Sequence, residues 1–541
     1  MSKFRSRPLL LAVLLGAASA IPASAQVMGR FHLQAPVVEP LQGLSQRIQN
    51  GEIHLKLGDF LTLVLANNTQ VHILRLAGAT AQAGVLAAHS PFDPSLGASF
   101  GSTRSVQPQV TQTSGAATLS TLGQNTSINY NQLFSTGQQV QINFLSNRNS
   151  SNSQFSTYNP SLGADMTFAL TQPLWRNRGN LQNRTSLLVA QTQVLVVTDQ
   201  TQTQIADELV TAADQYWNTV QARDQIRVQQ QALDLAQKSY ERDQNALKLG
   251  ALAPGNIFTS QAQVAQDQTQ LLQAQSTYRQ QLDLLRRLIG ADINPAARAA
   301  TLVLDDDPSA TVPAPPALPV EQAVAEALTH RPEMDVIERE QLQDRFSLNQ
   351  LRDSLHPQLN LTGNLGSNGL AGDAVPITTP LGVSVGGSSS GLGQALHQVF
   401  AFGSPTYGFN LSLNLPLRNS SGEAQLADAL VQQTTHAYQQ RDEAQQVTQE
   451  VRLADTQLRM AVAVVQSATT ARDLSQKNVD AEQQKYQLGS ITVFELLQAQ
   501  VQLSNAQSTL LGAYTGYQQA LIAYERATWT LLPQLGLKLS P

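Results

Sequence analysis

The chain has 541 residues, of which only 13% are charged, and its formal net charge is −5. It contains no cysteine, which excludes a disulfide framework, a thiolate zinc site, a cysteine nucleophile and a lipid-modified cysteine. The acidic balance also argues against nucleic acid as a partner.

The N-terminus (1–25) has the order of a secretory signal peptide. Three basic residues, Lys3, Arg5 and Arg7, precede an apolar run of about 12 residues and then the small residues Ala23-Ser24-Ala25. We expect cleavage after Ala25, because the run is too short to span a bilayer. No later segment supplies about 18 uninterrupted apolar residues, so we expect an exported chain without a transmembrane helix.

An N-terminal arm (26–50) leads into a first structural repeat (51–295). Apolar residues at helical spacing change at Pro91 and Pro94 to a strand at about 95–104, and a second alternating strand is expected at about 163–173. This strand ends at Pro173, because proline cannot donate into a strand ladder. A long helix at about 177–249 and a further helix at about 255–290 complete the repeat.

The loop between these two strands contains a possible hairpin near 126–146. Two alternating stretches flank Ser135-Thr136-Gly137, which is typical of a tight turn. We expect the hairpin to extend outside the cell. The alternative is that it joins the neighbouring strands and raises their number.

A second repeat (320–530) follows the plan of the first, after an acidic and proline-rich stretch (296–319) that is typical of an extended linker. We expect a helix, strands at about 358–366 and 406–416, a long helix at about 420–488 and a helix at about 493–530, before a C-terminal tail (531–541). Apolar or small residues in the long helix alternate steps of four and three, which predicts a coiled coil. They are Val447, Val451, Ala454, Leu458, Ala461, Val465 and Ala468.

This duplicated plan resembles the TolC-like outer membrane efflux protein family. The resemblance rests on "LKLGDFLTLVLANN" and its counterpart "PVEQAVAEALTHRPE", on the paired phrases "LTQPLW" and "LNLPLR", and on the Leu-Gly turns that end both long helices. It implies an α+β membrane protein, a homotrimer in which each protomer gives about four strands to a shared outer-membrane β-barrel of about 12 strands. A long α-helical coiled-coil tunnel would continue the barrel into the periplasm of a Gram-negative-type bacterium.

The implied function is that of the outer-membrane channel of an efflux or type I secretion system, which conducts substrates passively to the exterior. The implied partners are outer-membrane lipid, a periplasmic adaptor (membrane fusion) protein and an inner-membrane transporter of the RND or ABC type. No cofactor and no enzyme activity are expected, because no phosphate-binding glycine loop, nucleophile elbow or two-histidine metal motif is present. The alternative is an exported coiled-coil scaffold or adhesin-like protein without a pore.

The resemblance also points to residues at the helix turns. The acidic residues of the periplasmic entrance fall on Glu495 and Gln498, and the corresponding position of the first repeat is Asn256. Tyr486 matches a tyrosine that locks the closed entrance, whereas Ile491 stands where its basic partner is expected.

Some of the residues at these turns also have a purely structural explanation. Thr492 and Glu495 have the spacing of a capping box, which is compatible with a role at the entrance. The adaptor would contact the Leu-Gly turns at Leu249, Gly250, Leu488 and Gly489, where the two glycines also fit helix C-caps.

Overall fold

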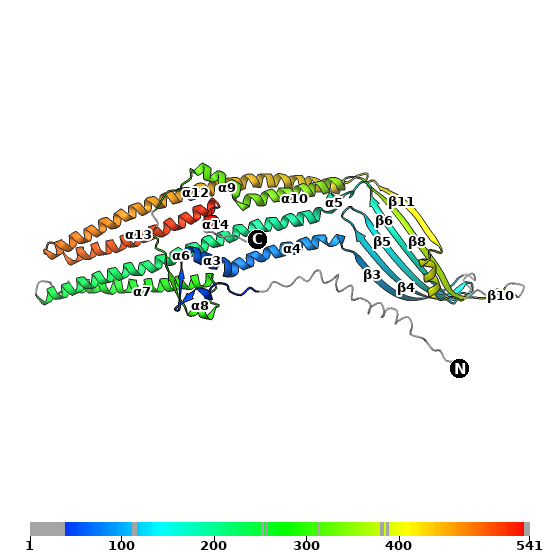
Figure 1. Ribbon diagram of the computed structural model, residues 1–541, viewed down its shortest axis with the longest axis horizontal. Coiled ribbons are helices and arrows are strands. Elements are labelled where there is room, and N and C mark those ends of the chain that lie inside the picture. Colours follow the sequence, from blue (N-terminus) through cyan, green and yellow to red (C-terminus); the bar gives the residue numbers. More distant parts are fainter. Residues whose placement is uncertain are drawn as a thin grey trace, which may run out of the picture.

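The computed structural model describes residues 38–110, 116–249, 254–255, 257–310, 313–378, 384–385 and 389–534. The expected signal peptide and the candidate site residues Gly250 and Asn256 lie outside the described residues. The molecule is a long rod with a curved sheet at one end and a bundle of long helices at the other (Figure 1).

The sheet has six strands in the order β11-β8-β6-β5-β4-β3, and every neighbouring pair is antiparallel. The strands are β3 (Ser95–Pro108), β4 (Thr118–Leu133), β5 (Gln139–Ser151), β6 (Tyr158–Pro173), β8 (Gln358–Ala374) and β11 (Pro405–Asn414). Four of them lie where the sequence predicts strands.

The expectation that the hairpin near 126–146 is a separate extracellular extension is wrong. Its two arms are β4 and β5, which pair with each other and insert between β3 and β6. The physical reason is that both arms are long enough to form ladders along the whole depth of the sheet. The protomer therefore contributes six strands to one sheet, not about four.

The turn of this hairpin is anchored where the sheet meets the helices. Gly137 has a φ of +88°, and a Cβ atom there would lie 2.4 Å from the carbonyl oxygen of Asn177. The Gly179 N–H donates to the Thr136 carbonyl at 3.4 Å, and the Gln138 amide donates to Gln172 at 2.7 Å. Glycine is thus required at the turn by its backbone conformation and by its close neighbours.

The sheet has one apolar and one polar face, and the strand registers keep these faces continuous. The apolar face carries Phe100, Ile128, Tyr130, Ile142, Phe144, Phe168, Leu170, Leu361, Leu365, Phe409 and Leu411. The polar face carries Ser99, Asn129, Asn143, Thr167, Thr362 and Asn410. Since side chains alternate along a strand, this separation requires the register of all six strands to agree.

A short helix, α11 (Leu392–Phe400), covers part of the apolar face. Its Ala395 and Val399 are buried against Ala164 of β6 and Ala371 of β8. A Cβ atom at Gly369 would lie 2.1 Å from the Ala395 carbonyl oxygen, so a glycine lets the helix approach the strand closely.

Four helices join the sheet, one at each of β3, β6, β8 and β11 (Figure 1). They are α4 (Thr69–His89), α6 (Thr185–Lys248, preceded by the short α5, Asn180–Asn183), α10 (Pro332–Ser354) and α12 (Ser420–Gln487). Further from the sheet, α7 (Ile257–Leu288) pairs with α6, and α13 (Val493–Ala527) pairs with α12. The heptad residues of α12 are buried in this second pair, with Ala461 half-buried.

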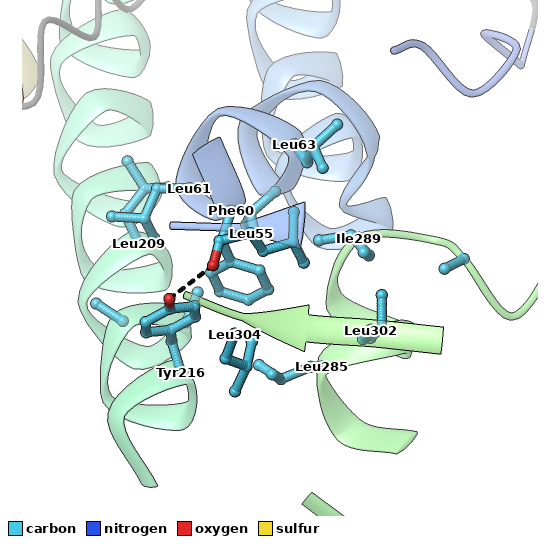
Figure 2. Close-up of a cluster of buried hydrophobic side chains, with 14 of the residues drawn as sticks. Leu55, Phe60, Leu61, Leu63, Leu209, Tyr216, Leu285, Ile289, Leu302 and Leu304 are labelled. Carbon is cyan, nitrogen blue, oxygen red and sulfur yellow. Dashed lines mark hydrogen bonds between the residues drawn. The ribbon is translucent and has the colours of Figure 1, made fainter. Parts of the chain in front are cut away.

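A compact region surrounds the middle of the bundle. A three-stranded sheet, β1 (Ile48–Gln49), β2 (Glu52–Leu55) and β7 (Thr301–Leu304), packs with α3 (Leu57–Asn67) and α8 (Pro295–Ala299) against α6 and α7. Figure 2 shows the core of this region, where Phe60 and Tyr216 lie among leucines of β2 and β7. In a separate core, α9 (Val320–His330) packs against α12.

The stretch expected as an extended linker is partly built into this region. Thr301–Leu304 pairs in parallel with β2, and Asp306 accepts hydrogen bonds from the Leu57 N–H at 2.7 Å and from the Tyr216 hydroxyl at 2.8 Å. A carboxylate at the first turn of α3 stabilises that helix N-terminus. The acidic run is therefore structural rather than simply solvated.

One described helix has the length and average composition of a membrane span, although polar residues interrupt it. This segment, Thr69–Phe92, comprises α4 and the short turn after it. Only 6% of its most apolar 18-residue window is buried. It runs along α6 within the helical bundle (Figure 1), so we assign it to the bundle.

Candidate functional site

The end of the bundle farthest from the sheet brings the tips of both helix pairs together. Tyr486 of α12 donates a hydrogen bond to Asp243 of α6 at 2.7 Å, and Ser260 of α7 donates to the second oxygen of the same carboxylate. The Arg242 guanidinium lies 4.5 Å from the centre of the Tyr486 ring. These contacts join the two halves of the protomer at the tip.

Asp243 is completely buried, and its charge is met by neighbours from three helices. Burial, and then the hydrogen bond to Asp243 and its charge, raise the pKa of Tyr486 to about 12. The tyrosine therefore stays protonated and remains the donor at neutral pH.

Sequence reasoning found Tyr486 but missed Asp243, Arg242 and Ser260. The only local signal is the charged pair Arg242-Asp243 within a heptad pattern, and such a pair is typical of the exposed side of a helix. The pairing with Tyr486 spans 243 positions in the sequence and becomes visible only in the fold.

Glu495 and Gln498 lie on the exposed side of α13, one turn apart. The capping box is present: the Thr492 N–H donates to the Glu495 carboxylate at 2.8 Å, and the Glu495 N–H donates to the Thr492 hydroxyl at 3.4 Å. The carboxylate thus caps the helix and still faces solvent.

The tip presents large apolar side chains to solvent. Leu249 and Leu488 are each 84% exposed, and Gly489 has a φ of +74°, as a helix C-cap requires. Phe258, near the start of α7, and Phe494, near the start of α13, are also exposed. Sequence reasoning did not select these two residues.

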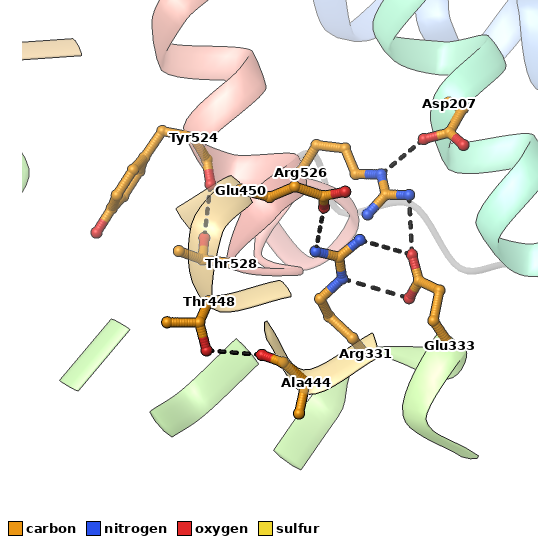
Figure 3. Close-up of polar contacts among 9 residues, drawn as sticks. All are labelled: Asp207, Arg331, Glu333, Ala444, Thr448, Glu450, Tyr524, Arg526 and Thr528. Atoms are coloured by element: carbon orange, nitrogen blue, oxygen red, sulfur yellow. Dashed lines mark hydrogen bonds and ion pairs between the residues drawn. The ribbon is translucent and has the colours of Figure 1, made fainter. Parts of the chain in front are cut away.

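A network of charges around the buried Arg331 ties the second half to the first (Figure 3). Arg331, only 3% exposed, contacts Glu333 at 2.7 Å and Glu450 of α12 at 2.5 Å. Arg526 of α13 bridges Glu333 at 3.0 Å and Asp207 of α6 at 2.7 Å.

The electrostatics of this network favour the charged forms. Burial alone would raise the pKa of Glu333, but the hydrogen bonds and charge of Arg331, with the charge of Arg526, lower it below its ordinary value. A half-buried carboxylate held by two arginines stabilises the fold through these partners, and loss of either arginine weakens that stabilisation.

Among the described residues, no group of three or more histidine and acidic side chains is arranged to hold a metal ion. The features that stand out are instead a two-faced sheet, a continuous bundle of long helices and a joined helical tip. Together they define an outer-membrane channel with a helical tunnel as the class of fold.

The family described as outer membrane efflux protein matches residues 323–528, which cover most of the second repeat. No curated protein matches the chain by sequence. Similar solved structures agree with the family match. Because those described here are below 25% identity, the likeness concerns the fold alone. They include a membrane protein from Pseudomonas aeruginosa (16% identity, 92% of this chain and 97% of that chain, TM-score 0.62).

Two further structures are channels. The CmeC outer membrane channel of Campylobacter jejuni has 14% identity over 93% of this chain and 90% of its own, with a TM-score of 0.60. The MtrE outer membrane channel of Neisseria gonorrhoeae, in its open state, has 16% identity over 88% and 89%, with a TM-score of 0.59.

These findings confirm the resemblance to TolC-like outer membrane efflux proteins. They support an outer-membrane efflux channel component with a large periplasmic portion, and they do not favour the pore-free scaffold.

Proposed function

We propose that three copies of this chain assemble into one passive conduit, in which the sheets close into a barrel and the helices form a periplasmic tunnel. The observation that carries the proposal is the two-faced sheet. Its apolar face suits lipid, its polar face of Ser, Thr and Asn suits water, and α4, α6, α10 and α12 continue from it.

The edges of the sheet also support closure with further copies. Nearly all residues of β3 and all of β11 are exposed, and each strand has one unpaired side. Since an unpaired strand edge is strongly disfavoured in lipid, these edges need partners. β3 leads away from the helices and β11 leads back to them, so a β3–β11 pair between copies is antiparallel like the other pairs.

The helical tip is the proposed periplasmic entrance. The Tyr486–Asp243 hydrogen bond holds the two helix pairs together, and Glu495 from three copies forms a ring that attracts cations. The exposed Leu249 and Leu488 are the proposed contacts of a periplasmic adaptor, which couples the conduit to an inner-membrane transporter.

The test is single-channel recording of the detergent-purified mature protein in a planar bilayer. We expect discrete conductance steps from a protein that requires detergent for extraction. A protein that washes off membranes as a soluble rod and gives no steps would overturn the proposal.

A further inference from the structure

We propose that the β4–β5 hairpin is part of the barrel wall, so that a trimer closes an 18-stranded barrel whose bore is as wide as the helical tunnel. Three protomers with six strands each give that number. The inference deepens the proposed function and rests on the proposed trimer, because it concerns which cargo the same conduit lets out.

The hairpin has the pairing of a wall element. β4 pairs with β3 from Thr118 to Asn131, and β5 pairs with β6 from Gln139 to Asn149. Its turn residue Gly137 lies close to the Asn177 carbonyl oxygen, at the end of the sheet where the helices begin. A hairpin lying above the membrane or folded into the lumen would not share both of its edges with the sheet.

The hairpin also has the two faces of a wall element. Ile142 lies opposite Phe168 on the apolar face, and its neighbour Asn143 lies opposite Thr167 on the polar face. The same alternation crosses to β4, where Ile128 lies opposite Phe144. The hairpin therefore presents one face suited to lipid and one suited to water, in register with its neighbours.

The perimeters of the sheet and the helices agree with six strands. A strand tilted by about 40° takes about 6 Å of barrel perimeter, so six strands take about 38 Å. The four helices that join the sheet, packed about 9 Å apart, take about 36 Å.

The consequence concerns the size of the cargo. Barrel diameter grows about linearly with strand number, so 18 strands give about 1.5 times the diameter of 12. Barrels of about this size leave an open aqueous channel. The barrel then sets no narrower limit than the tunnel, and the conduit suits bulky water-soluble cargo.

The first experiment uses the absence of cysteine from the chain, since single cysteines can be introduced without background. Asn143→Cys and Ile142→Cys are placed on opposite faces of β5, and Thr167→Cys and Phe168→Cys serve as the matched pair on β6. In liposomes, we expect a membrane-impermeant thiol reagent to label Asn143→Cys and Thr167→Cys. Ile142→Cys and Phe168→Cys should react only after detergent is added.

Two outcomes of this labelling separate the inference from the proposed function. Labelling of both β5 positions, with only Thr167→Cys labelled on β6, overturns the wall position of the hairpin and keeps the channel. Labelling of all four positions without detergent overturns the membrane barrel itself.

The second experiment measures the width of the bore. Deletion of residues 116–155 leaves β3 and β6, which run in opposite directions and can pair directly. Polyethylene glycols of increasing mass are added to the barrel side of single channels, and the largest that still lowers the conductance is recorded. We expect a larger limit for the full chain than for the deletion variant.

Equal limits for the two proteins would contradict the wide barrel. If the deletion variant does not insert, the diameter of the full-length trimer by electron microscopy replaces it. A barrel visibly narrower than the tunnel would then overturn the inference, and a barrel of matching width would support it.

Discussion

The two halves of the molecule share one plan of helices but contribute different numbers of strands to the six-stranded sheet. Each half supplies a helix before its strands, a long helix after them and a returning helix, yet the first half contributes four strands and the second contributes two. The comparison indicates that strands can be added without disturbing the bundle. A hairpin needs only neighbouring ladders and an anchored turn, whereas the paired helices α6–α7 and α12–α13 are packed against each other.

The largest effect on the charge network that joins the two halves is expected from Arg331→Met. The substitution leaves the half-buried Glu333 with only Arg526, and it removes the partner of Glu450, so we expect a loss of about 2–3 kcal/mol. Denaturant unfolding of the periplasmic helices, followed by circular dichroism, measures it. The control is Arg452→Met, whose partner Glu321 is exposed and whose effect should stay below about 1 kcal/mol. Equal effects would count against the network.

The hairpin, which the second half lacks, is tested at its turn by Gly137→Val. A β-branched residue at a φ of +88°, with a Cβ atom 2.4 Å from a carbonyl oxygen, should cost about 2 kcal/mol or more. We expect faster proteolysis between β4 and β5 in detergent. Gly97→Ser is the control, because no atom lies within 4 Å of its Cβ position. An unchanged cleavage rate in the valine variant would show that the turn is not anchored.

The junction of the halves at the tip is tested by Tyr486→Phe. Loss of the hydroxyl leaves one oxygen of the buried Asp243 without its donor, which should cost about 1–3 kcal/mol and loosen the tip. We expect more frequent openings in single-channel recordings. Tyr438→Phe is the control, because this tyrosine of α12 is 63% exposed. Identical opening frequencies for both variants would exclude the tip contact as a restraint.

The end of the second half carries a carboxyl that responds to pH. Burial raises the pKa of Glu525 to about 7 from an ordinary value of 4.5. The folded state binds this proton more tightly than the unfolded state, so stability is fully present below about pH 4.5 and decreases as pH rises to about 7. Glu525→Gln should raise the melting temperature by a few degrees at pH 8 and leave it unchanged at pH 4. A similar gain at both values would contradict this origin.

The smallest expected effect is at the entrance position predicted from the resemblance, where the second repeat has Glu495 and the first has Asn256. Glu495→Gln keeps a side chain that can complete the capping box, so stability should change little while cation selectivity falls. Reversal potentials in a salt gradient measure the change. Thr492→Ala is the control, because it weakens the cap and keeps the charge. Unchanged selectivity in Glu495→Gln would exclude the ring.

Periodicity in the sequence was sufficient to predict the long helices and four of the strands. Six of the seven heptad residues of α12 are buried and Ala461 is half-buried, because the spacing of apolar residues along one helix is a local property that marks its buried face. The hairpin was recognised but misplaced. Alternation shows that a stretch is a strand, whereas the choice of its neighbours depends on pairing between distant segments.

The same limit explains what was missed at the candidate site. Tyr486 and Glu495 stand beside a turn that can be read from the sequence, but Asp243 lies within a helix and pairs with a residue far along the chain. Asp306 lies in a run of three aspartates, a pattern typical of a solvated loop. Its role depends on the N-terminus of α3, about 250 positions earlier, which periodicity cannot connect to it.

The position of Arg526 links the order of synthesis to the order of folding. This arginine lies near the end of α13, the last long helix of the chain, and it holds Asp207 and Glu333 from two earlier helices. A nascent chain in which α13 has not yet been made lacks this bridge, so its central charges remain incompletely paired. Completion of the bundle therefore depends on a helix that is synthesised after both of the helices it joins.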